Sequence, residues 1–330
     1  MADNQAVVLQ GLKAYPFTIE KATKPQPGPG QLVIKNAAVA INPADWKIQS
    51  EGGWPNKYPL VLGFDASGIV EDVGPDVTRF KKGQRVIAHC STLLTLDPAY
   101  GAFQLYPLVH EAQVAAIPDS LPFEQGVVLP LGISTAASGL YPEDCLNLPL
   151  PAVDGAKKTG QTLLVWGGAS SMGATTIQLA VASGLTVVTT ASPRNHDFVL
   201  SLGADAAFDY RSTSVVEDLA NALAGTEFVG VYDAISEEPS FNAISAILDR
   251  LNSTVKVISV LPFHATSLVQ DANRDIGEWV WGTYVPQALA KGTLKPKPDP
   301  CIVGTGLKDI QHGVDLLKKG VSAQKLVVTL

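Results

Sequence analysis

The segment from Leu163 to Gly173 constrains this chain more than any other, because it joins a buried-strand pattern to a helix through a turn of small residues. Leu163 to Trp166 is a short apolar run, which is typical of a buried strand. Gly167 and Gly168 allow the backbone to turn sharply, and Gly173 lets the following helix pack closely on the strand. Free N–H groups and the helix dipole favour an anion at the N-terminus of that helix. The segment therefore predicts a phosphate-binding turn.

The turn differs from the usual G-x-G-x-x-G pattern of dinucleotide sites at its middle position. Read from Gly168, that position is Ser170, so a Cβ stands where the backbone approaches the phosphates. A glycine-rich turn without a ligand is the alternative on these residues alone. The context favours a dinucleotide site, because residues 174–183 have an apolar helical face and residues 185–190 form a second apolar strand. The residues expected to contact the cofactor phosphates are Gly168, Ala169, Ser170, Ser171, Met172 and Gly173.

Composition excludes several classes of partner. The chain has 330 residues, of which 46% are apolar, and this length suits two domains. It carries 24 Lys and Arg against 31 Asp and Glu, without a dense basic stripe, so we expect no nucleic-acid partner. No apolar stretch approaches the ~20 residues that span a bilayer, and residues 1–11 do not resemble a secretory signal. We therefore expect a cytoplasmic protein that does not bind membranes.

The order of predicted elements divides the chain into two architectures. In the first 120 residues, short strands alternate with Gly, Pro and Asp clusters, which predicts an irregular β-barrel. Between residues 163 and 261, strands alternate with helices, which predicts a doubly wound parallel sheet. The expected strands are 6–9, 31–41, 67–73, 85–89, 103–109, 163–166, 185–190, 206–208, 230–234, 255–261, 279–285, 301–303 and 325–330. A surface loop is expected at 146–160 and a helix at 307–319.

Several phrases, in their order along the chain, resemble the medium-chain dehydrogenase/reductase superfamily, and most of all its fungal members related to quinone reductases and stand-alone enoyl reductases. The resemblance implies an α/β fold with a Rossmann doubly wound parallel sheet and a GroES-like β-barrel catalytic domain. It implies a catalytic domain at 1–126, an NADPH-binding domain at 127–288 and a return to the catalytic domain at 289–330. The phrases are Asn42-Pro43-Ala44-Asp45-Trp46-Lys47, Leu62-Gly63-Phe64-Asp65-Ala66-Ser67-Gly68, Lys82-Gly83-Gln84-Arg85-Val86, Gly101-Ala102-Phe103-Gln104, Leu129-Pro130-Leu131-Gly132-Ile133-Ser134-Thr135 and the glycine turn.

The resemblance also locates the positions at which zinc-dependent members of the superfamily hold their metal. Placing the motifs side by side puts Asn42, Phe64 and Leu131 where a Cys, a His and a second Cys would stand. None of these side chains is a thiolate or imidazole, the ligands that suit catalytic zinc. The Cys-rich lobe of a structural zinc has no counterpart either. We expect no metal site, and scattered residues such as His89 and Cys90 are read as packing or surface groups.

The end of the second strand of the sheet indicates the cofactor. NAD-selective sites tend to carry an acid there, which binds the ribose hydroxyls. Ser192 and Arg194 follow the strand instead, and a hydroxyl with a guanidinium suits a 2′-phosphate. In similar reductases a tyrosine after the third strand also contacts that phosphate, and Tyr210 stands at the matching position. We therefore expect NADPH, with a solvated Arg194 and a half-buried Tyr210 as the alternative.

Without a metal, the simplest reaction is hydride transfer to the β-carbon of an α,β-unsaturated carbonyl. Negative charge then develops on the carbonyl oxygen, where hydrogen-bond donors stabilise it. The resemblance implies that Asn42 and Lys47 lie near the substrate and Thr135 against the nicotinamide. Lys47 is the first candidate to polarise the carbonyl or supply the proton. The same resemblance places the backbone of Val260, Leu261 and Phe263 beside the nicotinamide carboxamide.

The leading function is thus a zinc-independent NADPH-dependent reductase of small apolar unsaturated carbonyls or quinones. One alternative is a trans-acting enoyl reductase whose substrate is presented by the acyl carrier protein of a polyketide synthase. A second is a non-catalytic NADPH-binding protein, and a third, disfavoured by the missing ligands, is a metal-dependent alcohol dehydrogenase. The resemblance leaves a monomer and a homodimer open, the dimer pairing through an edge strand at 279–285.

Overall fold

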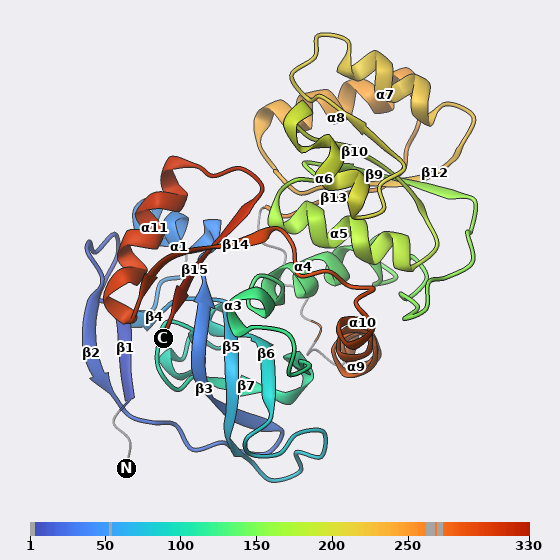
Figure 1. Cartoon of the computed structure of the whole chain (residues 1–330). Helices are drawn as coiled ribbons and strands as arrows, with labels where there is room; N and C mark the ends of the chain where they lie inside the picture. Colours follow the sequence, from blue (N-terminus) through green and yellow to red (C-terminus); the bar gives the residue numbers. More distant parts are fainter. Residues whose placement is uncertain (1–3, 53–54, 262–267, 269–272) are drawn as a thin grey trace. The chain divides into compact units, whose positions relative to one another are not determined.

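A computed structural model describes residues 4–52, 55–261, 268 and 273–330 (Figure 1). The chain divides into two compact units. The first consists of Met1–Leu131 together with Asp299–Leu330, and the second of Gly132–Pro298. The two units thus divide after residues 131 and 298, whereas the sequence analysis expects domain limits after residues 126 and 288.

The first unit is built mostly from antiparallel strands in two sheets. In the smaller sheet, β1 (Asn4–Leu9) lies between β2 (Thr18–Ala22) and β4 (Leu60–Val61). The larger sheet has the order β14-β15-β3-β5-β6-β8, and β7 also pairs with β3. Its strands are β3 (Gln31–Ala40), β5 (Asp65–Val73), β6 (Arg85–His89), β7 (Leu108–His110), β8 (Val114–Ala116), β14 (Asp299–Thr305) and β15 (Gln324–Thr329).

Backbone hydrogen bonds join the two sheets and give the first unit its barrel-like character. The N–H of Val7 in β1 donates to the carbonyl of Phe103 over 2.8 Å, and the N–H of Leu105 donates to the carbonyl of Gln5 over 3.0 Å. The segment 103–107 therefore serves as a connector, and only its continuation into β7 is a regular strand. The expected strand at 103–109 is thus much shorter in the structure, at Leu108–His110.

Two helices of the first unit pack against each other, and one of them also contacts the C-terminal strands β14 and β15. α1 (Pro43–Glu51) packs against α11 (Ile310–Lys319), and the Lys318 ammonium donates to Ser50 Oγ over 3.0 Å. α11 lies between β14 and β15, as the periodic apolar residues at 307–319 predict. The shorter helices of this unit are α2 (Thr92–Thr95) and α3 (Phe123–Gly126), with 3₁₀ turns at Pro98–Tyr100, Glu111–Gln113 and Leu307–Asp309.

The second unit contains a five-stranded parallel sheet of order β11-β10-β9-β12-β13. In chain order this is 3-2-1-4-5, the doubly wound arrangement in which ligands bind where the strand order reverses, here between β9 and β12. The sequence-based prediction of a parallel doubly wound sheet is confirmed. The strands are β9 (Gln161–Trp166), β10 (Thr186–Thr190), β11 (Ala206–Phe208), β12 (Glu227–Asp233) and β13 (Val257–Ser259).

Helices cover both faces of this sheet (Figure 1). Leu164 and Trp166 of β9 pack in one apolar cluster with residues of α7 (Val215–Leu223) and α8 (Glu238–Leu251). α5 (Ser171–Ala182) and α4 (Pro130–Leu140) cover the opposite face, where a Cβ at Gly139 would meet the Tyr232 ring at 2.7 Å. α6 (His196–Ser201) lies between β10 and β11. As expected, residues 146–160 form no helix or strand.

The prediction of a strand at 279–285 is wrong, because this segment is helical. α9 (Arg274–Trp279), a π-helical turn (Val280–Tyr284) and α10 (Val285–Lys291) form one continuous helical stretch. Its aromatic and β-branched residues have high strand propensity, but their burial follows a helical period through positions 280, 281, 284, 285, 288 and 289. Burial against the rest of the unit overrides local propensity here. The dimer edge expected at this segment is therefore not a strand.

Within the described part of the chain, none of the helices has both the length and the apolar character that a bilayer crossing requires.

The two tryptophans of this helical stretch provide a test of its conformation. Trp281 is fully buried and its Nε1 donates to Ser134 Oγ over 3.2 Å, whereas Trp279 is 39% exposed. In a strand, residues 279 and 281 would share one face. We expect Trp281→Ala to lower the free energy of unfolding by about 3–5 kcal/mol and Trp279→Ala by less than half of that, measured by guanidinium denaturation. Equal losses for the two variants would contradict the helix.

Candidate functional site

The glycine turn between β9 and α5 has the close approaches that the sequence predicts. Gly167 has a φ of +82°, and its N–H donates to Thr190 Oγ1 over 2.9 Å. A Cβ on Gly173 would lie 2.3 Å from the carbonyl oxygen of Gly167 and 2.6 Å from the Cα of Gly168. Glycine at position 173 therefore allows α5 to start directly against the end of β9.

Ser170, the departure from the dinucleotide pattern, is the N-cap of α5. Its backbone is extended, with φ −72° and ψ 163°, and its Oγ accepts a hydrogen bond from the Gly173 N–H over 3.0 Å. The hydroxyl of the next residue, Ser171, is buried and has no hydrogen-bond partner among the described residues. An unpaired hydroxyl at a helix N-terminus fits a phosphate oxygen. The residues of the turn thus suit a dinucleotide phosphate group.

The residues that follow the neighbouring parallel strands β10 and β11 lie at the carboxyl end of the sheet. Ser192 is buried after β10, and its Oγ accepts a hydrogen bond from Asn195 Nδ2 over 3.1 Å, while Arg194 is exposed. Tyr210 follows β11 and is 41% exposed. The parallel pairing of Thr190 with Phe208 sets these two segments side by side.

Arg211 joins this group, although the sequence analysis did not include it among the site residues. Its guanidinium donates to the Tyr210 hydroxyl over 2.8 Å and stacks on the Tyr210 ring at 5.0 Å from the centroid. Two guanidinium groups, on Arg194 and Arg211, thus follow adjacent strands at this edge. The neighbouring position of Arg211 in the phrase Asp209-Tyr210-Arg211 was the available signal.

The carboxyl ends of β12 and β13 lie at the same end of the sheet as the turn after β9 and the segments after β10 and β11. Asp233 is fully buried, and its carboxylate accepts hydrogen bonds from the N–H groups of Ile235 and Ser236 over 3.0 and 3.1 Å. The Ser236 hydroxyl accepts from the N–H groups of Val260 and Leu261 over 2.8 and 3.2 Å. These two expected cofactor-binding residues are thus held at the strand end by a buried polar group that periodicity did not reveal. Phe263, the third expected residue, lies outside the described residues.

Thr135, the expected nicotinamide neighbour, lies on α4 and is partly buried. Its carbonyl accepts a hydrogen bond from the Tyr232 hydroxyl of β12 over 3.0 Å. This bond ties α4 to the strand beside β9 in the sheet order.

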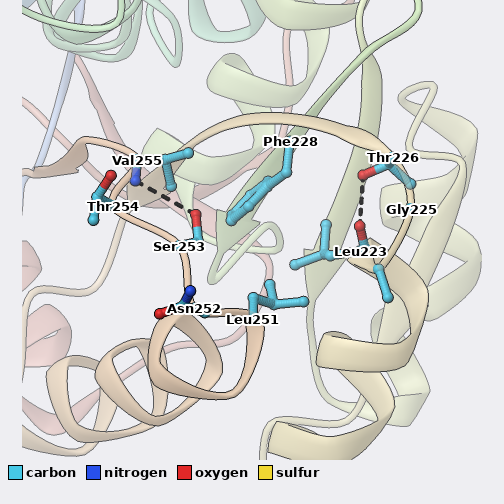
Figure 2. Close-up of a pocket in the computed structure, with 10 residues that line it drawn as sticks. Leu223, Gly225, Thr226, Phe228, Leu251, Asn252, Ser253, Thr254 and Val255 are labelled. Atoms are coloured by element: carbon cyan, nitrogen blue, oxygen red, sulfur yellow. Dashed lines mark hydrogen bonds between the residues drawn. The ribbon is translucent and has the colours of Figure 1, made fainter.

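A pocket of about 460 Å³ opens at the opposite end of the same sheet, at the amino ends of β12 and β13 (Figure 2). It is lined by the loops before β12 and β13, which include Thr226 and Ser253, and by the Phe228 ring. Thr226 Oγ1 donates to the Leu223 carbonyl over 2.7 Å. Because the pocket lies at the amino ends of these strands, it does not contribute to the site at their carboxyl ends.

In the first unit, four buried polar residues form a network where α1 begins. Asn42 Nδ2 donates to Asp65 Oδ2 over 2.7 Å, and the Lys325 ammonium lies 3.0 Å from the same oxygen and donates to Asn42 Oδ1. Asp45 accepts from the N–H groups of Asn42 and Gly63 over 2.7 and 3.1 Å. Burial raises the pKa of the Asp45 carboxyl to about 7, with the two backbone hydrogen bonds acting in the opposite direction.

The two expected substrate residues of the first unit differ in accessibility. Asn42 is 1% exposed, and both its amide oxygen and its amide nitrogen are bonded inside the network. Lys47 lies on α1 and is partly exposed, with its ammonium 5.5 Å from the centroid of the Trp46 ring. Of the two, Lys47 is the side chain that can reach a ligand.

Two family profiles match the chain: the alcohol dehydrogenase GroES-like domain over residues 28–119 and the zinc-binding dehydrogenase over residues 171–269. A trans-enoyl reductase of Aspergillus japonicus is 43% identical over 91% of this chain and 90% of its own length. A dehydrogenase of Emericella nidulans is 37% identical over the full length of both chains. Among solved structures, an alcohol dehydrogenase superfamily protein from Novosphingobium aromaticivorans superposes with a TM-score of 0.79 and 27% identity over 99% of each chain.

The zinc that the second profile name implies does not fit the residues of this chain. The phenyl ring of Phe64 and the isobutyl group of Leu131 offer no donor atom, and the Asn42 amide oxygen accepts from an ammonium ion. Burial lowers the pKa of His89 to about 4, and its Nδ1 lies 3.1 Å from Gln113 Nε2. Among the residues described, no three His, Cys, Asp or Glu side chains are grouped as a metal site requires.

The glycine turn can be tested without knowledge of the substrate. We expect Gly173→Ala to weaken binding of a nicotinamide dinucleotide at least about tenfold, because its Cβ would push α5 away from the turn. The measurement is calorimetric titration with NADPH and NADH. Gly11→Ala is the matched control, since a Cβ at Gly11 meets nothing within 4 Å. Unchanged affinity in the Gly173 variant would place the dinucleotide elsewhere.

Proposed function

The chain belongs to the medium-chain dehydrogenase/reductase superfamily, and on this premise we propose that it is an NADPH-dependent, zinc-independent reductase of α,β-unsaturated carbonyls or quinones. The observation that carries the proposal is the replacement of metal ligands by Asn42, Phe64 and Leu131, of which Asn42 is bonded to an internal ammonium ion. Without a Lewis acid, deprotonation of a simple alcohol is disfavoured. Reduction of an activated double bond requires only a hydride, a hydrogen-bond donor and a proton.

We infer that the second unit holds NADPH at the carboxyl edge of its sheet, where the bound cofactor supplies the hydride. The turn from Gly168 to Gly173 binds the pyrophosphate through helix N-terminal N–H groups and the Ser171 hydroxyl. Ser192, Arg194 and Tyr210 bind the 2′-phosphate, and guanidinium groups suit phosphate oxygens. The backbone of Val260 and Leu261 and the α4 residue Thr135 border the nicotinamide ring.

In the first unit, Lys47 is the proposed substrate-binding group. Its ammonium donates a hydrogen bond to the carbonyl oxygen of the substrate and stabilises the charge that develops there. The proton that completes the reduction reaches the α-carbon from Lys47 or from water. Asn42 holds the start of the helix that carries Lys47, through the bonds described above.

A trans-acting enoyl reductase is the more specific form of the same proposal. The relative in Aspergillus japonicus bears that name and matches nearly the whole chain. In this form an acyl carrier protein presents an unsaturated acyl chain, and the chemistry at Lys47 is unchanged.

Three free cysteines, Cys90, Cys145 and Cys301, fit a reducing compartment such as the cytoplasm.

Cofactor selectivity tests the basic group at the edge of the sheet. We expect Arg194→Ala to raise the KM for NADPH about tenfold to a hundredfold, because a charge-assisted bond to the 2′-phosphate is lost. The KM for NADH should change less than about twofold, because NADH lacks that phosphate. Steady-state kinetics with both cofactors provide the measurement. Arg250→Ala, on the exposed side of α8, is the control. Equal losses with the two cofactors would argue against a 2′-phosphate site.

A substrate panel tests the proposed reaction. We expect the purified enzyme to oxidise NADPH with enones, enals, enoyl thioesters or quinones, and a chelator should leave the rate unchanged. Lys47→Met should lower kcat about a hundredfold or more, the usual cost of losing an oxyanion donor or general acid. Lys81→Met, an exposed lysine between β5 and β6, is the control.

The outcomes of this panel separate the alternatives. Faster turnover of a carrier-bound acyl chain than of the free thioester would select the trans-acting form. Cofactor binding without oxidation by any acceptor would indicate a non-catalytic protein. Alcohol or aldehyde turnover that a chelator abolishes would indicate the metal-dependent class and end the proposal.

A further inference from the structure

The first unit buries an ammonium ion, which proteins rarely do without a partner of opposite charge. Lys325 is 3% exposed, and its partners Asp65 and Asn42 are 0% and 1% exposed. An unpaired charge at such depth is strongly unfavourable, so the contacts of this ion determine whether the site folds. The Lys325 ammonium meets an oxygen of each partner, at 3.0 Å from Asp65 Oδ2.

Asp65 connects this ion to two other elements. Its Oδ2 accepts from Asn42 Nδ2 over 2.7 Å, and its Oδ1 accepts from the Leu131 N–H over 2.6 Å. Asn42 precedes α1, and Leu131 lies in the first turn of α4. One buried ion pair therefore holds the N-terminal ends of two helices and the strands β5 and β15.

α1 is attached to this network at two points of its first turn. Lys325 and Asp65 bind the amide of Asn42, and Asp45 caps both the Asn42 N–H and the Gly63 N–H. Lys47 follows two residues after Asp45, on the same helix. Any shift of this turn would therefore move the Lys47 backbone.

We propose that Lys325 is a positioning residue: its ammonium is an internal cation that, through Asp65 and Asn42, fixes the first turn of α1 and thereby the Lys47 ammonium at the substrate. The inference rests on the proposed function for its kinetic readout. Lys325 acts through other residues, because its buried ammonium is bonded to Asp65 and Asn42. It also connects two of the three positions at which zinc-dependent relatives bind metal, Asn42 directly and Leu131 through Asp65.

A neutral double variant separates positioning from stability. Lys325→Met alone leaves a buried carboxylate unpaired, and we expect its Tm to fall by about 10 °C. Adding Asp65→Asn removes the net charge. Its amide keeps one acceptor oxygen for the Leu131 N–H, and its NH2 group can donate to Asn42 Oδ1, which has lost the Lys325 donor, once the Asn42 amide turns over. Most of the Tm should therefore return. We expect the double variant to retain a kcat loss of about tenfold to a hundredfold, with the KM for NADPH within about twofold of the wild type.

Hydrogen exchange supplies a readout that needs no substrate. The backbone amides of residues 45–50 should exchange faster in the double variant than in the wild type, while those of α5 should not change. Lys291→Met with Asp154→Asn is the matched control, since this pair, 2.6 Å apart, is exposed. Its Tm, kcat and exchange should stay at wild-type values.

The proposal is overturned if the double variant regains its Tm together with wild-type kcat, or if exchange in α1 is unchanged. If the double variant does not fold, Asn42→Leu provides the test, because it removes the link to α1 but keeps the Lys325–Asp65 pair. This variant should show the same kcat loss and faster amide exchange in α1. Wild-type values of both kcat and exchange would overturn the proposal. If the wild type oxidises no NADPH with any acceptor, the proposed function fails, and exchange alone then decides the role of Lys325.

Discussion

The first unit depends on the buried ammonium ion of Lys325, which must form its hydrogen bonds with other groups of the protein because water does not reach it. Lys325 is brought to Asn42 across 283 residues of chain by β15, which pairs with β3 beside the start of α1. The N–H of Ile41 donates to the carbonyl of Leu326 over 2.9 Å, so the backbone next to both partners is also joined. The return of the C-terminal segment to the first unit therefore completes its polar centre, in addition to extending its sheet.

A different constraint governs the second unit, where a helix must begin directly at the end of a strand. The small turn residues allow that approach, and the Ser170 cap shows how the dinucleotide pattern tolerates a side chain at its middle position. Its hydroxyl turns back to the Gly173 N–H and satisfies a donor that the helix leaves unpaired. The serine thus stabilises the turn, and the Ser171 hydroxyl supplies a free polar group.

Prediction from sequence succeeded where structure depends on neighbouring residues. The strands at 85–89 and 206–208 have the expected limits, and the β9–turn–α5 unit has the expected order. It failed at 279–285, where strand-forming residues are buried with a helical period. It also missed the hydrogen bond from Arg211 to Tyr210, and it assigned Asn42 to the substrate without revealing that the amide is bonded to Asp65 and Lys325. These features depend on residues that are far apart in sequence or on adjacent strands.

By itself, the sequence determined the superfamily, the parallel sheet with its glycine turn, and the loss of the thiolate and imidazole ligands, because each is a matter of residue type and local spacing. Only the tertiary structure decided which polar groups are occupied by one another: the Asn42 amide by Lys325 and Asp65, and the Val260 and Leu261 N–H groups by Ser236. A hydrogen bond depends on distance and direction between two atoms, and chain separation says nothing about either until the strands have paired.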